Sequence, residues 1–160
     1  MDGTGILVVK ASITALPGAW IALGTCDNVR FPSINRDDVA RVLALEALSD
    51  VPEIKARVAH RAVTSPRVVR TLFAVVVLAE CLTALLLVAG SGLLMLSATG
   101  FVSQECVLLV ALTGAAAFTG VSASFLIGGK WFYCWYGEFG QQTHLLATLW
   151  GLATLIVLLI

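Results

Sequence analysis

Residues 71–96 read TLFAVVVLAECLTALLLVAGSGLLML, and this stretch decides the fold because it contains a single charged residue, Glu80. A helix needs about 20 predominantly apolar residues to cross the hydrocarbon core of a bilayer. The stretch exceeds that length, so we expect the helix to tilt or to protrude from the membrane. The pattern predicts a transmembrane helix over 71–96.

Three further apolar stretches lie along the chain, at about 6–25, 107–129 and 143–160. Overall, 59% of the 160 residues are hydrophobic and 12% are charged, whereas soluble domains have about a quarter charged residues. So little charge cannot cover a surface that faces water, and contact with lipid removes that need. The sequence therefore predicts a single polytopic membrane domain over 1–160, an all-α bundle of four transmembrane helices.

Residues 26–66 form a long polar segment between the first two stretches and hold most of the lysines and arginines and three of the four prolines. Within the segment, residues 35–38 (NRDD) resemble the start of a capped helix, and apolar residues recur over 39–45. We expect an amphipathic extramembrane helix that lies on the membrane surface or covers the bundle. A solvated loop helix is the alternative.

Four spans place both termini on one side of the membrane and the two longer connections on the other. The side of these loops has nine Lys and Arg residues, and the side of the termini has only Lys10. Because cytoplasmic loops are enriched in basic residues, the charge distribution predicts that the loops are cytoplasmic.

Two charged residues inside the spans are candidates for function. Glu80 lies ten residues after Arg70, or about 15 Å along a helix, which places it near the middle of the bilayer. An ionised carboxylate there costs several kcal/mol unless it is paired. Glu80 is therefore either part of a proton or cation relay or a protonated or paired group that fixes helix packing. Lys10 is expected to snorkel to the interface or to contact Glu80.

The third span has small residues at four successive i+4 positions: Ala116, Gly120, Ser124 and Gly128. Small residues let the backbones of two membrane helices approach closely. We expect this stripe to pack against another helix, either of this chain or of another subunit.

Aromatic residues cluster directly after the third span, where residues 128–136 read GGKWFYCWY. Amphipathic rings favour the headgroup layer of a membrane. The cluster predicts an aromatic belt, or else a platform for a ligand or partner that includes Trp131, Phe132 and Trp135.

The sequence contains no recognisable catalytic, phosphate-binding or metal-binding motif. The four cysteines have neither metal-site nor redox-site spacing. A membrane haem normally uses two facing axial histidines, and the chain has only His60 and His144, both on the side of the loops. We expect no enzymatic activity, no metal and no cofactor, and we keep haem or quinone binding near His144 as an alternative.

Four features occur together in this sequence: Lys10, the stretch RAVTSP at 61–66, Glu80 followed by Leu-Thr at 82–83, and GGKWF at 128–132. In this combination the chain resembles the bacterial family of predicted small integral membrane proteins, a domain of unknown function. The resemblance covers nearly the whole chain, and the loop stretches at 61–66 and 128–132 are its most specific parts.

The resemblance implies a contact surface at the end of the molecule where the loops lie. Its residues are Arg61, Thr64, Ser65, Pro66, Trp131, Phe132 and Trp135. It also implies cytoplasmic termini and external loops, opposite to what the charge distribution predicts. Lys130 stands where the family usually has an acid, and EFGQ at 138–141 stands where it has WNGQ, so a site at these positions would be altered here.

The lack of recognisable chemistry favours a non-catalytic accessory or scaffold subunit of a larger complex in the cytoplasmic membrane of a bacterium. Its expected partners are the lipid bilayer and other membrane subunits, or further copies of the chain. Ten basic residues balance ten acidic ones, and no basic arm is present, so no nucleic-acid partner is expected. The alternative from another class is a small proton- or ion-coupled transporter centred on Glu80.

Overall fold

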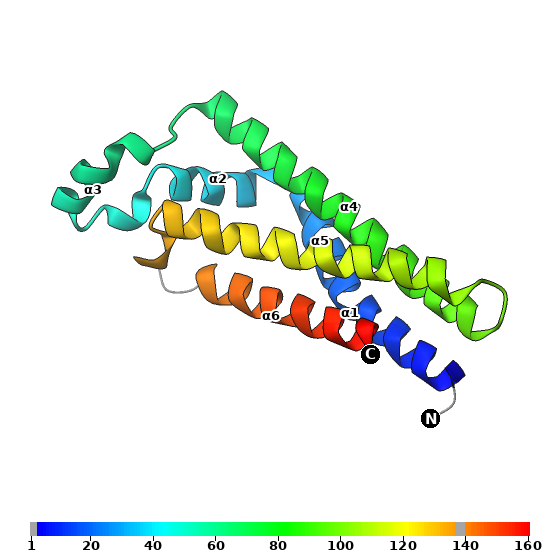
Figure 1. Ribbon diagram of the computed structural model, residues 1–160. Coiled ribbons are helices and arrows are strands. Elements are labelled where there is room, and N and C mark those ends of the chain that lie inside the picture. The colour runs from blue at the N-terminus through cyan, green and yellow to red at the C-terminus, as the bar shows by residue number, and fades with distance from the viewer. Residues whose placement is uncertain (1–2, 137–139) are drawn as a thin grey trace.

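Four long helices make up most of the molecule (Figure 1). The computed structural model describes residues 3–136 and 140–160, and the regular structure in that part of the chain is entirely helical. The long helices are α1 (Gly3–Arg30), α4 (Pro66–Ala98), α5 (Gln104–Trp131) and α6 (Gly140–Leu159). Each contains a stretch that is long and apolar enough to cross a membrane. The predicted all-α fold with four transmembrane helices is confirmed.

The helices extend beyond the apolar stretches that predict them. Helix α1 continues to Arg30 rather than ending at residue 25, and α4 begins at Pro66 rather than at residue 71. An apolar stretch marks only the part of a helix that contacts hydrocarbon, whereas the backbone hydrogen bonds continue into the interface. Pro66 occupies the first turn of α4, where its missing N–H costs nothing.

Short helices fill the connection between α1 and α4. They are α2 (Pro32–Leu43), η1 (Glu46–Leu48), α3 (Pro52–Val58) and η2 (Ala59–Arg61). Helix α2 packs against α1 and α4, so the predicted extramembrane helix covers part of the bundle. The predicted start at residues 35–38 is wrong, because the helix begins with Pro32, which has the backbone φ that a first helical position requires.

The spans follow one another in space, with α1 against α4, α4 against α5, and α5 against α6. In Figure 1 the turn between α4 and α5 lies toward the same end as the start of α1 and the end of α6, and α2 and α3 lie at the opposite end, here called the loop end. Two glycines allow α4 and α5 to approach closely. A Cβ on Gly90 would lie 2.8 Å from the Cα of Ala111, and a Cβ on Gly114 would lie 2.9 Å from the backbone nitrogen of Leu87.

Three aromatic rings join α1, α5 and α6 around the buried Phe118. The centroid of the buried Phe118 ring lies 5.9 Å from that of Trp20 and 6.2 Å from that of Trp150, both in edge-to-face geometry. The two indoles are 6.5 Å apart. Such pairs stabilise a core beyond the area that they bury. This cluster connects α1 to the two helices that it otherwise contacts little.

Candidate functional site

Glu80 belongs to a chain of polar side chains at the corner between α1 and α2. The Nδ2 of Asn28 donates a 2.7 Å hydrogen bond to the Glu80 carboxylate, and the amide of Asn35 in turn donates to the Oδ1 of Asn28. Asn28 is only 7% exposed, so its amide depends on these partners. The three residues connect α4, α1 and α2.

The partner of Glu80 shows where along the bundle this contact lies. Counting residues along α4 alone puts Glu80 near the middle of the bilayer. Its partner Asn28, however, lies between Asp27 and Arg30 in the last turn of α1, so the contact lies at the end of that helix. Helix α4 continues beyond this point toward the loop end, where α2 packs against it. The contact therefore favours the interpretation in which Glu80 fixes the packing of the helices.

Lys10 contacts the end of α6 and not Glu80. Its side chain is only 6% exposed, and its Nζ donates a 3.0 Å hydrogen bond to the backbone carbonyl of Leu158, in the last turn of α6. The last carbonyls of a helix lack backbone partners within it, and the helix dipole favours a cation there. The expected contact with Glu80 is wrong, because the partner of Lys10 is a backbone group that no sequence pattern marks.

The stripe of small residues on α5 faces outward. Ala116, Gly120 and Ser124 are exposed, and within residues 3–136 and 140–160 no atom of another element lies within 4 Å of a Cβ placed on Gly120 or Gly128. A different face of α5 makes the contacts inside the chain, at Val107, Ala111, Gly114, Ala115, Phe118, Ser122 and Gly129. The pattern allowed a partner helix from this chain or from another subunit. The described residues of this chain provide no such helix.

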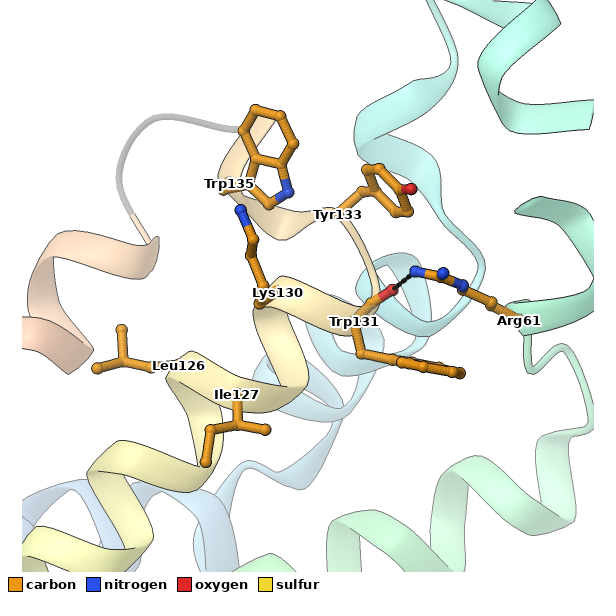
Figure 2. A pocket seen from close by; sticks show the side chains of 7 residues that line it. All are labelled: Arg61, Leu126, Ile127, Lys130, Trp131, Tyr133 and Trp135. Carbon is orange, nitrogen blue, oxygen red and sulfur yellow. Dashed lines mark hydrogen bonds between the residues drawn. The ribbon is translucent and has the colours of Figure 1, made fainter. Parts of the chain in front are cut away.

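A pocket of about 680 Å³ lies at the loop end of α5 (Figure 2). Its lining residues are Arg61, Leu126, Ile127, Lys130, Trp131, Tyr133 and Trp135. Arg61 reaches in from η2, and the other residues belong to the last turns of α5 and the segment that follows it. Residues that are 70 positions apart in the sequence therefore form one site.

Both cations in the pocket lie over aromatic rings. The guanidinium carbon of Arg61 is 4.3 Å from the ring centroid of Trp131 and 5.4 Å from that of Tyr133. The Nζ of Lys130 is 4.6 Å from the ring centroid of Trp135. The Nη1 of Arg61 also donates a 3.4 Å hydrogen bond to the carbonyl oxygen of Trp131. These contacts hold the two charged groups in place at the rim.

A family model described as "Predicted small integral membrane protein (DUF2165)" matches residues 6–160. The chain belongs to this family. A search of curated proteins finds no significant match, and a search of solved structures finds none. The family description identifies a membrane protein with no assigned function, and the four spans agree with it.

This member of the DUF2165 family brings together only some of the residues expected at its loop surface. Arg61, Trp131 and Trp135 line the pocket. Thr64, Ser65 and Pro66 are exposed and form the entry to α4. Phe132 caps the end of α5 and is half-buried outside the pocket. Glu138 and Phe139, in the expected loop stretch, lie outside the described residues.

The two histidines of this DUF2165 protein have different surroundings. His60 is exposed on η2. His144 lies on α6 with its ring centroid 4.8 Å from that of Phe125, and its buried Nδ1 has no hydrogen-bond partner among the described residues. In the same part of the chain no group of three His, Cys, Asp or Glu residues could hold a metal ion.

Asn28 is the residue of the candidate site around Glu80 that the sequence pattern missed. Seven of the nine buried residues of α1 recur at alternating spacings of three and four, at Leu7, Ala11, Thr14, Gly18, Ile21, Thr25 and Asn28, and the other two, Lys10 and Pro17, lie beside this line. This heptad spacing is typical of a helix seam. Extending it past the end of the apolar stretch identifies Asn28 as an inward-facing residue. Nothing comparable identifies Arg61 as a partner of Trp131.

Proposed function

We propose that the chain is a non-catalytic accessory subunit that packs against a helix of another membrane protein along the outward face of α5. The observation that carries this proposal is the exposure of Ala116, Gly120 and Ser124. Association between membrane helices depends on close packing and not on removal of apolar surface from water. A stripe without large side chains therefore favours a helix over lipid as its neighbour.

The glycines of the chain support this proposal by comparison. Gly90 and Gly114 lie where α4 and α5 meet, and a Cβ on either would clash with backbone. Gly120 lies on the same helix as Gly114 but has no neighbour within 4 Å of a Cβ. The outward stripe thus has the small residues of an internal helix contact, but no helix of the described chain packs against it.

A substitution on the stripe tests the proposal. The tagged chain is purified in mild detergent from its native membrane, and partners are identified by mass spectrometry with a visible spectrum of the same sample. Gly120→Leu should abolish stoichiometric partners while the chain stays folded. Gly92→Leu is the matched control, because Gly92 is also an exposed glycine without a close neighbour, on α4.

The alternative outcomes of this purification separate the other hypotheses. A lone colourless chain, or a partner that Gly120→Leu and Gly92→Leu retain equally, would contradict docking along α5. A haem absorption band would instead support cofactor binding near His144.

A second candidate function is proton- or ion-coupled transport at Glu80. The observation in its favour is that Asn35, the outer end of the Asn35–Asn28–Glu80 chain, is exposed. A polar path thus joins the surface of the loop end to the carboxylate. Proton or solute flux in proteoliposomes that Glu80→Gln abolishes would support this function, and flux that Glu80→Gln leaves unchanged would contradict it.

We also propose the cytoplasmic membrane of a bacterium as the location of the protein. The support is the resemblance of its loop motifs to a bacterial family, together with helical spans of the length that such a membrane requires. Fractionation of the native cell, with the tagged chain followed by immunoblot, tests this proposal.

A further inference from the structure

The pocket at the loop end of α5 combines cationic, aromatic and apolar groups at the level where a span ends. We propose that it binds the phosphate of an anionic phospholipid of the phosphatidylglycerol type, with part of an acyl chain against Leu126 and Ile127. The pocket is an open depression beside a span, which suits a ligand that stays partly in the membrane better than an enclosed small molecule. The proposal concerns the isolated chain and does not depend on a partner subunit.

The charges of the pocket favour an anion. Neither Arg61 nor Lys130 forms an ion pair among the described residues, where the two salt bridges are Arg36–Asp37 and Arg41–Asp38, both within α2. Arg61 donates a single hydrogen bond to the described residues, from its Nη1 to the carbonyl of Trp131. A guanidinium has five N–H donors and matches the geometry of phosphate, so Arg61 has donors left for a ligand.

The aromatic rings argue against a zwitterionic choline headgroup. A quaternary ammonium group binds over open ring faces. Here Arg61 already lies over Trp131, and Lys130 already lies over Trp135. A choline group would meet two cations in place of a free aromatic cage. The pocket should therefore discriminate phosphatidylglycerol from phosphatidylcholine.

The apolar part of the pocket favours a lipid over a soluble phosphate. Figure 2 shows Lys130 extending toward Trp135, Arg61 entering from the opposite side across Trp131, and Leu126 and Ile127 one turn earlier on α5. Ile127 is 72% exposed and lies within a helix apolar enough to span the membrane. A lipid with its phosphate at the cations would therefore have its acyl chain on the membrane side, against Leu126 and Ile127. A free phosphate has no apolar group to make that contact.

Lipid titrations of the purified, delipidated chain in detergent test the proposal. Binding is followed by native mass spectrometry and by the shift in thermal unfolding temperature, with phosphatidylglycerol, phosphatidylcholine and glycerol 3-phosphate as separate probes. Phosphatidylglycerol should bind most tightly. Arg61→Gln and Lys130→Gln should each weaken its binding about tenfold or more, because each removes a charge-assisted contact. Arg61→Lys should restore binding only in part, since it loses the planar fork of donors.

Arg57→Gln is the matched control, because it removes an exposed positive charge from α3 at the same end of the molecule. It should leave the affinity unchanged. Lys130→Gln keeps the test decisive if Arg61→Gln fails to fold, since Lys130 is exposed. Equal affinity for the two lipids, or an equal loss in the Arg57 and Lys130 variants, would overturn the proposal. Glycerol 3-phosphate binding as tightly as the lipid would overturn the lipid assignment.

Discussion

At the scale of single residues, the charged side chains inside the spans have polar partners on other helices. Glu80 of α4 accepts a hydrogen bond from Asn28 of α1, and Lys10 of α1 donates to the carbonyl of Leu158 in α6. A buried polar group costs free energy unless its hydrogen bonds are made. Each pair therefore fixes the position of one helix against another.

Replacing Glu80 separates the loss of a charge from the loss of a hydrogen-bond acceptor. Glu80→Leu leaves the buried amide of Asn28 without its acceptor, and we expect it to lower the free energy of unfolding by about 1–3 kcal/mol. Glu80→Gln keeps an acceptor oxygen for Asn28 and should have a smaller effect. Reversible unfolding in detergent, followed by circular dichroism, measures both. A Leu variant as stable as the native chain would show that this hydrogen bond does not hold the corner.

The sequence identifies Glu80 and Lys10 as unusual residues but not their partners. A charged residue within an apolar stretch can be recognised in the sequence. A backbone carbonyl such as that of Leu158 cannot, because every residue has one. Asn28 escapes notice because it follows the apolar stretch, where polar residues are ordinary. The pocket is visible in part, since the aromatic cluster is contiguous, but Arg61 joins it only through the path of the chain from η2.

At the scale of the elements, α5 presents small residues on two faces with different neighbours. The inner face meets α4 at Gly114 and contains the buried Phe118, while the outer face has Gly120. A spacing of four along a helix identifies a face but not what it contacts. The predicted stripe therefore has the composition of a packing face, and only the structure shows that it is directed away from the described chain.

Of two leucine substitutions on α5, one should destabilise the fold and the other should be tolerated. In Gly114→Leu the new Cβ would lie 2.9 Å from the backbone nitrogen of Leu87, and backbone cannot move aside as a side chain can. We expect a loss of at least about 1–3 kcal/mol in the free energy of unfolding. Gly120→Leu should be tolerated by the isolated chain. Thermal unfolding of the two variants in the same detergent is the measurement, and equal destabilisation would contradict the outward direction of Gly120.

The extent of each span is the part of the fold that hydropathy underestimates. Apolar residues stop where lipid stops, but helix α4 continues for 33 residues, or about 50 Å. The existence and order of the four spans follow directly from the sequence. The short helices α3, η1 and η2 do not, because their ends depend on prolines and on local turns more than on a repeating apolar pattern.

At the scale of the whole molecule, the first helix is held to the last two mainly at isolated points. Helix α1 packs along α4, and it meets α5 and α6 through the cluster of Trp20, Phe118 and Trp150 and through the Lys10 hydrogen bond. The bundle thus depends on a few contacts for its closure.

Removing the central ring tests that dependence. Phe118 is fully buried, and Phe118→Ala should lower the free energy of unfolding by about 3–5 kcal/mol because it leaves a cavity and removes the ring that both tryptophans contact. Phe101→Ala is the control, since Phe101 is 83% exposed in the turn between α4 and α5. Unfolding followed by tryptophan fluorescence is the measurement, since two of the four tryptophans belong to the cluster. Similar losses for both variants would refute the central role of Phe118.

The hydrogen bond between Lys10 and Leu158 joins residues that are 148 positions apart. At about 5–20 residues per second, a ribosome needs roughly 7–30 s to synthesise the chain between them. During that interval the ammonium group of the first helix has no final partner, and it must stay in water, at the membrane surface or within the insertion machinery. Helix α1 therefore reaches its full set of contacts only after α6 has been synthesised.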